Sequence, residues 1–266
     1  MQHPPVSCMC LTYGRSNVLE EAIHSFLIQD YLGKKELIIL NDLKEQTLIF
    51  DHPEVTVINL KERVKPLGVK RNICARACSH DILFPWDDDD IYLPHRISTS
   101  IENLKAHGGD YFKPDRGYYW NNGSIDDLVM NTFHSQSCFT RVLFDSVAGY
   151  ASMGSGEDQD IEQRFSNKGA YNIVAMDIRD YYYIYRWGGI DHYHISAFGM
   201  DSDDKAVSGE QKVGLIIKTG LLSGAIPSGD IILNPHWNAD YLTQKIMFDS
   251  KLKKVAISAS GDTSST

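Results

Sequence analysis

The sequence predicts an α/β fold with a doubly wound, mostly parallel sheet. Short apolar runs alternate with amphipathic segments of helical period over the first 94 residues. Three of these runs end in polar residues, at Thr12, at Asp42 and at the acidic run Asp87–Asp90. Parallel strands share one carboxyl edge, where such folds bind ligands, so we expect these three ends to meet at one rim.

The first four strands and the helices between them follow from local patterns. Asn17, with Glu20 three residues later, resembles a capping box that opens the first helix, and Gly33 ends that helix. A second helix is expected at residues 68–78, before the strand that carries the acidic run. The expected strands span residues 6–12, 36–40, 55–60 and 81–84.

The rest of the chain continues the alternation and then weakens. A helix after Pro94 should end at Gly108, and Asn121-Asn122-Gly123 indicates a hairpin turn. Further strands are expected at 133–139, 172–176 and 181–185, and helices at 141–147 and 157–169. We therefore expect one main domain at 1–200, an appended C-terminal helical extension at 201–257 and a disordered tail at 258–266.

Composition limits the function classes. The chain has 266 residues, of which 42% are hydrophobic and 23% charged, with no apolar run long enough to cross a bilayer and no signal-peptide pattern. This predicts a soluble, cytoplasmic protein, with peripheral attachment to a membrane left open. The five cysteines are expected to be core thiols. The net charge of -9 disfavours a broad nucleic-acid surface but leaves a local basic patch open.

The acidic run is the strongest chemical signal. Four carboxylates at the end of a buried strand raise one another's pKa unless a cation lies among them. Asp87 and Asp89 are two residues apart, so in an extended backbone they can converge on one Mg2+ or Mn2+ ion. The alternative is a polar turn in which Asp90 caps the following helix.

Three stretches together resemble the successive motifs of family-2 glycosyltransferases with the GT-A fold. They read VSCMCLTYGRSNVLEEAIHSFLIQDYLGKKELIILND, LGVKRNICARACSHDILFPWDDDDIYLPHRI and GSGEDQDIEQRF, and the resemblance extends from Val6 to Ser196. It implies a nucleotide-sugar donor, with UDP-sugars favoured, a divalent ion (Mn2+ or Mg2+) and inverting transfer to a hydroxyl or amine. Residues 1–94 would then bind the donor and residues 95–200 the acceptor.

The resemblance also implies a role for each motif residue. Asp158 would be the catalytic base, with Glu157 beside it in the motif and Trp187 near the acceptor. The metal ligands would be Asp89 and His194, although the run of four aspartates leaves the register open by one position. The donor-binding residues would be Thr12, Tyr13, Arg15, Asp42, Arg71, Asp87 and Asp88.

Each assignment has a structural alternative. Thr12 and Asp42 are also ordinary strand-end caps, and Glu157-Asp158 could merely complement a helix dipole. Asp160 is the competing choice of base. Arg71 could lie on a solvated helix face with the other cations nearby, Lys61, Arg63, Lys65 and Lys70. His192 and His194 could be surface residues or, with Asp191, a zinc site.

The pattern favours transfer of a single sugar. Processive members carry a Gln-x-x-Arg-Trp motif and membrane helices, whereas Tyr183 stands here at the Gln position before Arg186-Trp187. The competing functions are nucleotidyl transfer or nucleotide-sugar hydrolysis on the same fold, and a catalytically inactive sugar-nucleotide-binding protein. A glycan, a protein side chain and a modified nucleobase all stay open as acceptors.

Overall fold

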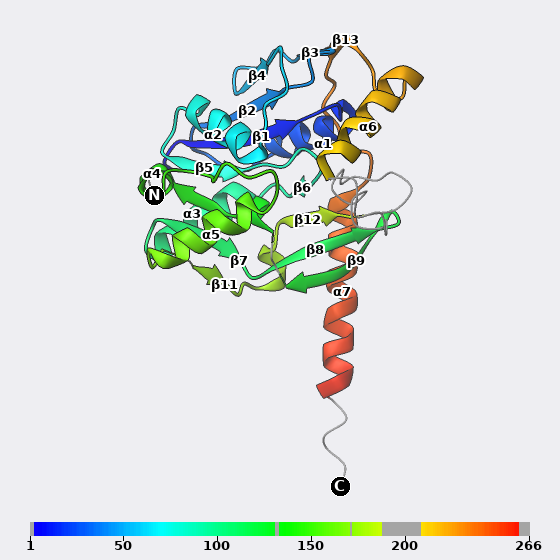
Figure 1. Ribbon diagram of the computed structural model, residues 1–266. Coiled ribbons are helices and arrows are strands. Elements are labelled where there is room, and N and C mark those ends of the chain that lie inside the picture. Colours follow the sequence, from blue (N-terminus) through cyan, green and yellow to red (C-terminus); the bar gives the residue numbers. More distant parts are fainter. Residues whose placement is uncertain (1–2, 131–132, 171, 188–208, 261–266) are drawn as a thin grey trace.

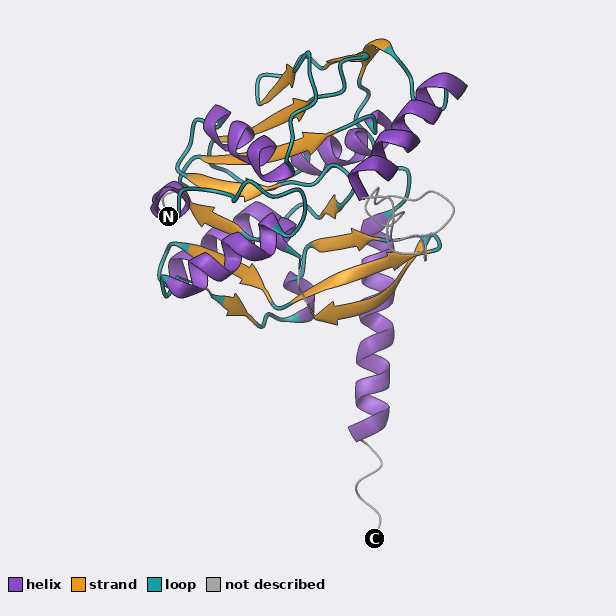
Figure 2. Cartoon of the chain, viewed as in Figure 1, coloured by secondary structure: helices purple, strands orange, loops and turns teal. Residues whose placement is uncertain are grey.

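The computed structural model describes residues 3–130, 133–170, 172–187 and 209–260. Within these residues the strands form sheets of seven, four and two strands (Figure 1). The seven-stranded sheet forms the centre of the fold, with helices on both of its faces (Figure 2).

The large sheet confirms the prediction of a mostly parallel, doubly wound architecture. Four neighbouring strands, β5, β1, β2 and β4, run parallel, whereas β10 is antiparallel to both β5 and β7. In spatial order the strands are β11 (Ile173–Val174), β7 (Tyr111–Pro114), β10 (Cys138–Thr140), β5 (Ile82–Pro85), β1 (Val6–Thr12), β2 (Lys35–Asn41) and β4 (Val55–Asn59).

Two apolar cores cover the two faces of this sheet. Side chains alternate along β1, so Cys8 and Cys10 enter one core and Met9 enters the other. The first core packs against helices α1 (Ser16–Leu27) and α3 (Arg96–Ala106). The second packs against α2 (Leu67–Ala77), α4 (Arg141–Ser146) and α5 (Glu157–Asn167). All five cysteines are buried free thiols, as predicted.

A second sheet follows the acidic run. Its strand order is β6 (Ile91–Tyr92), β12 (Tyr183–Arg186), β8 (Arg116–Asn121) and β9 (Ser124–Met130). The predicted hairpin turn is confirmed, since Asn122 and Gly123 link β8 to β9 with φ values of 50° and 83°. Helix α7 (Tyr241–Ser260) packs along this sheet and then projects beyond it (Figure 2).

The C-terminal region is joined to the N-terminal half. After α6 (Gly209–Ser223), strand β13 (Gly229–Ile232) pairs in parallel with β3 (Gln46–Ile49), so the expected helical extension also contains a strand. Helix α7 continues to Ser260, past residue 258 where the tail was expected to begin. None of the described helices is both long and apolar enough to cross a membrane.

Three local predictions were wrong, the first being the end of α1, which stops at Leu27 with Ile28 as its C-cap, well before Gly33. Helix α1 begins at Ser16 with Arg15 as its N-cap and no side-chain cap, because the Glu20 carboxylate instead accepts the backbone N–H of Asn234 (2.8 Å). The strand expected at 133–139 is largely a 3-10 turn, η1 (His134–Gln136), followed by β10. That turn places His134 against α5, where its Nδ1 lies 2.9 Å from Glu162. A second short turn, η2 (Ile178–Asp180), precedes β12.

Candidate active site

The polar ends of β1, β2 and β5 meet at one rim of the large sheet, as predicted. Lys70 joins two of them, because its Nζ donates to the Thr12 carbonyl (2.7 Å) and to Asp42 Oδ1 (2.6 Å). Lys70 is only 2% exposed, so this part of α2 is not the solvated face that was the alternative for Arg71. Burial lowers the pKa of Lys70, and the Asp42 carboxylate opposes that shift.

The four aspartates of the acidic run differ in their surroundings. The Asp87 side chain is 30% exposed, whereas Asp88, Asp89 and Asp90 are buried. Asp90 accepts hydrogen bonds from the Tyr183 hydroxyl (2.6 Å) and from the Arg186 backbone N–H (3.2 Å). Asp90 does not cap α3, which begins at Arg96. The Asp90 carboxylate is thus bonded to the second sheet through β12.

A cation already lies among these carboxylates. Arg15 donates to Asp89 Oδ2 (2.6 Å) and to Asp88 Oδ1. Burial raises the pKa of Asp88, while the neighbouring guanidinium of Arg15 lowers it. Carboxylate oxygens are the ligands that Mg2+ and Mn2+ prefer, so this cluster fits a hard divalent ion. Within the described ranges, no group of three or more His, Cys, Asp and Glu side chains closes around one point, and His194 lies outside those ranges.

Arg71 connects the acidic run to the start of α5. Its Nε donates to Glu157 Oε1 (3.0 Å), and its Nη1 lies 3.4 Å from Asp87 Oδ1. Its side chain is 13% exposed, and its guanidinium carbon lies 5.7 Å from the centre of the Tyr150 ring. The two predicted motifs, 70 residues apart in the chain, are therefore held together by one guanidinium.

Glycine allows the loop before α5 to reach this position. A Cβ atom on Gly68 would lie 1.9 Å from the Ala151 carbonyl oxygen, so any larger residue would push the loop away from α2. The Gly68 N–H donates to the Met153 carbonyl (3.0 Å). Gly156 then caps α5 with φ of +76° and places Glu157 beside Arg71.

The carboxylates at the start of α5 have different partners. Asp158 is half-buried, and its Oδ1 accepts the backbone N–H of Gln159 (2.8 Å). Asp160, the competing choice of base, pairs with Arg164 (Nε to Oδ2, 2.9 Å). Arg164 also donates to the Gly149 carbonyl (2.7 Å), so Asp160 helps to hold the preceding loop. The choice of Asp158 as the base stays a prediction from the motif.

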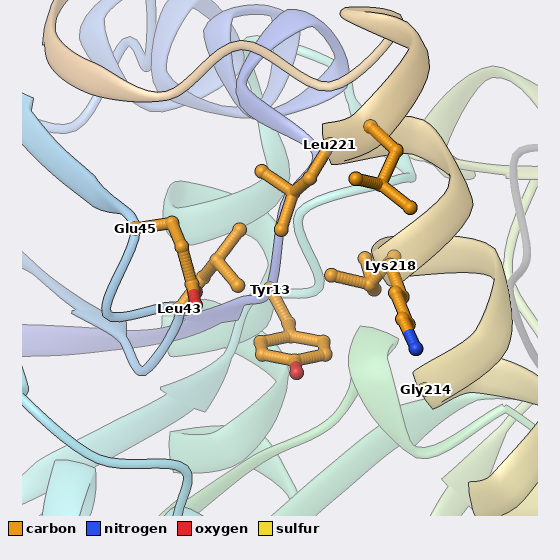
Figure 3. Close-up of a pocket in the computed structure, with 8 residues that line it drawn as sticks. Tyr13, Leu43, Glu45, Gly214, Lys218 and Leu221 are labelled. Atoms are coloured by element: carbon orange, nitrogen blue, oxygen red, sulfur yellow. The ribbon is translucent and has the colours of Figure 1, made fainter.

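Arg63 contacts both Tyr13 and Asp42. The guanidinium carbon of Arg63 lies 3.5 Å from the centre of the Tyr13 ring, and its Nη1 donates to Asp42 Oδ1 (2.9 Å). Figure 3 shows the Tyr13 ring between the loop after β2 and helix α6, at a hollow of about 280 Å3. The residues that line the hollow are Tyr13, Leu43, Glu45, Gly214, Ile217, Lys218, Leu221 and Leu222.

Arg186 is a site residue that the sequence analysis did not single out. It is fully buried, pairs with Glu21 of α1, and donates from Nε to the Asp89 carbonyl (2.6 Å). Its Nη1 also lies 3.2 Å from the Tyr241 hydroxyl of α7. A charged residue inside an aromatic strand needs a buried partner, and this signal was present in the sequence. Trp187 follows, half-buried and 5.9 Å from the ring of Tyr185.

The chain is similar to known glycosyltransferases in sequence family and in fold. A family model described as "Glycosyl transferase family 2" matches residues 7–154, and a search of curated proteins found no match. The structure of S. aureus TarS 1-349 in complex with UDP-GlcNAc is similar, with a TM-score of 0.55 and 16% identity over 82% of this chain and 66% of that one. The structure of mannosyltransferase PcManGT from Pyrobaculum calidifontis, in complex with GDP-Man and Mn2+, is also similar. Its TM-score is 0.55, with 12% identity over 97% of this chain and 81% of that one.

This chain spans only part of the length of the TarS chains that it matches. This chain covers 60% of another TarS 1-349 structure and 41% of a longer TarS chain. At these identities the likeness shows a shared fold, which agrees with the GT-A architecture expected from the motifs.

Proposed function

The chain belongs to glycosyl transferase family 2, and on this premise we propose that it moves one sugar from a nucleoside-diphosphate sugar to an acceptor hydroxyl or amine with inversion. The observation that carries the proposal is the ion-pair chain from Asp87 through Arg71 to Glu157. It holds the acidic run and the start of α5 against each other, which is where the motifs place the donor and the base. The complexes of similar structures with UDP-GlcNAc and GDP-Man support a nucleotide-sugar donor, and we favour a UDP-sugar.

The proposed roles follow from the chemistry of each side chain. Arg71 presents a planar guanidinium at the rim, suited to donate paired hydrogen bonds to the diphosphate as negative charge develops on it. Asp158 is the half-buried carboxylate at the start of α5 that takes the proton from the acceptor. Asp160 is proposed instead to hold Arg164, with which it forms an ion pair.

The acidic run is proposed to hold Mn2+ or Mg2+. Asp89 would be a direct ligand with Asp87 close by, and the Arg15 guanidinium, which now pairs with Asp88 and Asp89, would have to give way to the ion. His194 is proposed as a further ligand from the motif alone. When bound, a divalent ion supplies positive charge that stabilises the departing diphosphate.

Transfer of one sugar, without processive extension, is supported by Tyr183. Its side chain is 1% exposed, and its hydroxyl lies 2.6 Å from Asp90 and 2.8 Å from Ser135. A tyrosine held in this way inside the second sheet takes the place of the Gln in the motif of processive members.

A thermal-shift screen of nucleotide sugars with Mn2+ tests the donor site. A donor at about 100 times its Kd should stabilise the fold by about 2.7 kcal/mol, which corresponds to a rise in Tm of a few degrees. Asp89→Ala should lose this donor- and metal-dependent rise, whereas the exposed control Asp51→Ala should keep it. An Asp89→Ala protein that is stabilised as strongly as the wild type would contradict the site.

Product analysis tests the reaction. With a suitable acceptor, the sugar should appear on the acceptor and the free nucleoside diphosphate in equal amount. Release of free sugar that is unaffected by any acceptor would instead favour nucleotide-sugar hydrolysis.

A further inference from the structure

Arg63 makes two contacts that are unusual in combination. Its guanidinium carbon lies 3.5 Å from the centre of the Tyr13 ring, and its Nη1 donates to Asp42 Oδ1 at 2.9 Å. Arg63 lies between β4 and α2, about 50 residues from Tyr13 and 21 from Asp42 in the chain. A planar group therefore covers an aromatic ring and donates an N–H to a carboxylate at the same time.

The buried Asp42 does not depend on Arg63 for its charge balance. Lys70 Nζ lies 2.6 Å from Asp42 Oδ1, and the Val64 N–H donates to Asp42 Oδ2 (3.0 Å). Lys70 is 2% exposed, whereas the Arg63 side chain is 29% exposed. Lys70 and the Val64 amide would thus keep Asp42 neutralised and hydrogen-bonded if the Arg63 side chain moved away.

A nucleobase with a ring N–H on its pairing edge would make the same two contacts. Its ring would stack on Tyr13, and its N–H would donate to the Asp42 carboxylate. Uracil and guanine carry such a ring N–H, whereas cytosine and adenine in their usual neutral forms do not. We infer that Arg63 competes with the donor's base for Tyr13 and Asp42, and that a bound uracil or guanine nucleotide displaces it. This inference rests on the proposed donor site at the rim.

Two hollows adjoin Tyr13. A small hollow beside Tyr13 and Arg63 is bounded by Lys65, Val213 and Gly214. The larger hollow continues along α6 on the Tyr13 side (Figure 3). Helix α6 lies outside the part of the chain that the family model matches, so this wall is supplied by the C-terminal extension.

Whether removing Arg63 strengthens or weakens the binding of UDP distinguishes competition between Arg63 and the base from a direct contact between Arg63 and the nucleotide. UDP is an anion, so removing a nearby positive charge would ordinarily weaken its binding. If Arg63 must first leave Tyr13 and Asp42, its removal instead spares the loss of one partly exposed ion pair and one cation–π contact. Together these contacts correspond to a change of roughly tenfold in affinity.

Isothermal titration of the full chain with UDP, GDP, CDP and ADP in the presence of Mn2+ tests the inference. Arg63→Ala and Arg63→Gln should each bind UDP or GDP roughly tenfold more tightly than the wild type. Arg63→Lys keeps the charge without the planar group and should lie in between. The control Arg116→Ala removes a 44% exposed arginine that pairs with its neighbour Asp115, and it should change nothing.

Three results would overturn the inference. If the wild type binds UDP or GDP and both neutral Arg63 variants bind it equally or more weakly, Arg63 does not compete with the base and the proposed donor site still stands. A preference for CDP or ADP would exclude the contact between Asp42 and a ring N–H, because cytosine and adenine offer only an exocyclic amino N–H on that edge. If neither the wild type nor the variants bind any of the four nucleotides, the proposed function fails and the inference fails with it.

Discussion

The buried ion cluster behind α5 offers the most direct test of how the site is held. Glu162 accepts hydrogen bonds from the Tyr111 hydroxyl (2.9 Å) and from Lys113 Nζ (2.7 Å), and lies 2.9 Å from His134 Nδ1. Lys113 is 1% exposed and His134 3%, so both depend on this carboxylate. Glu162 is on the same helix as Asp158, four residues further on. We predict that Glu162→Gln destabilises the fold and displaces the start of α5.

The magnitude follows from the pKa of Glu162. Burial by itself would raise this pKa, but the hydrogen bonds and charges of His134 and Lys113 outweigh burial and lower the pKa from 4.5 to about 2. Lowering the pKa from 4.5 to about 2 on folding corresponds to about 3 kcal/mol of stability. Removing one partner of a buried ion pair costs a similar amount, about 3–5 kcal/mol, because the other charge is left uncompensated.

The sign of the pH dependence is also determined. Because the pKa is lower in the folded protein, the contribution of Glu162 is fully present above pH 4.5 and is lost as the pH falls toward 2. Urea unfolding followed by tryptophan fluorescence should show a wild-type advantage of about 3 kcal/mol at pH 7. That advantage should shrink steadily as the pH is lowered from 4.5.

A matched substitution controls for the change from Glu to Gln. Glu102→Gln alters an exposed glutamate on α3 and should change the free energy of unfolding by less than about 0.5 kcal/mol at any pH. A Glu162→Gln protein within about 1 kcal/mol of the wild type at pH 7 would refute the reasoning, and so would a difference that stays constant from pH 5 to 3.

Three further variants separate roles within the site. Asp158→Asn should bind donor with unchanged affinity in calorimetry, but its rate of sugar transfer should fall by about 100-fold or more. If that loss is seen in Asp160→Asn and not in Asp158→Asn, Asp160 is the base. Asp90→Asn should lower the free energy of unfolding by about 1–3 kcal/mol through its bonds to Tyr183, while metal affinity changes little; a large loss of Mn2+ binding would shift the metal register. Arg186→Met should cost about 3–5 kcal/mol in urea unfolding, since it leaves the Glu21 carboxylate buried without its cation, and a neutral result would contradict that account.

The sequence by itself determined the layered architecture and the general position of the site. The period of apolar residues reports which face of a strand or helix is buried, and this local signal predicted β1, β2, β4, β5 and the helices α1 to α5, whereas β7 of the same sheet was not predicted. The acidic run follows a buried strand directly, so its place at the carboxyl edge also followed from the chain order. The spacing of the motifs pointed to the family that the comparison confirmed.

Only the tertiary structure decided what each charged side chain does. Four consecutive aspartates look equivalent in sequence, yet Asp90 is bonded to Tyr183 whereas Asp89 is bonded to Arg15. The sequence indicates no more than a surface cation at Arg63, but in the folded protein its guanidinium lies over the Tyr13 ring. Likewise Arg186 looks like an ordinary strand residue, but in the structure it pairs with Glu21 of α1. The reason is physical: periodicity records whether a position is buried, whereas the pairing of buried charges depends on side chains that only folding brings within hydrogen-bonding distance.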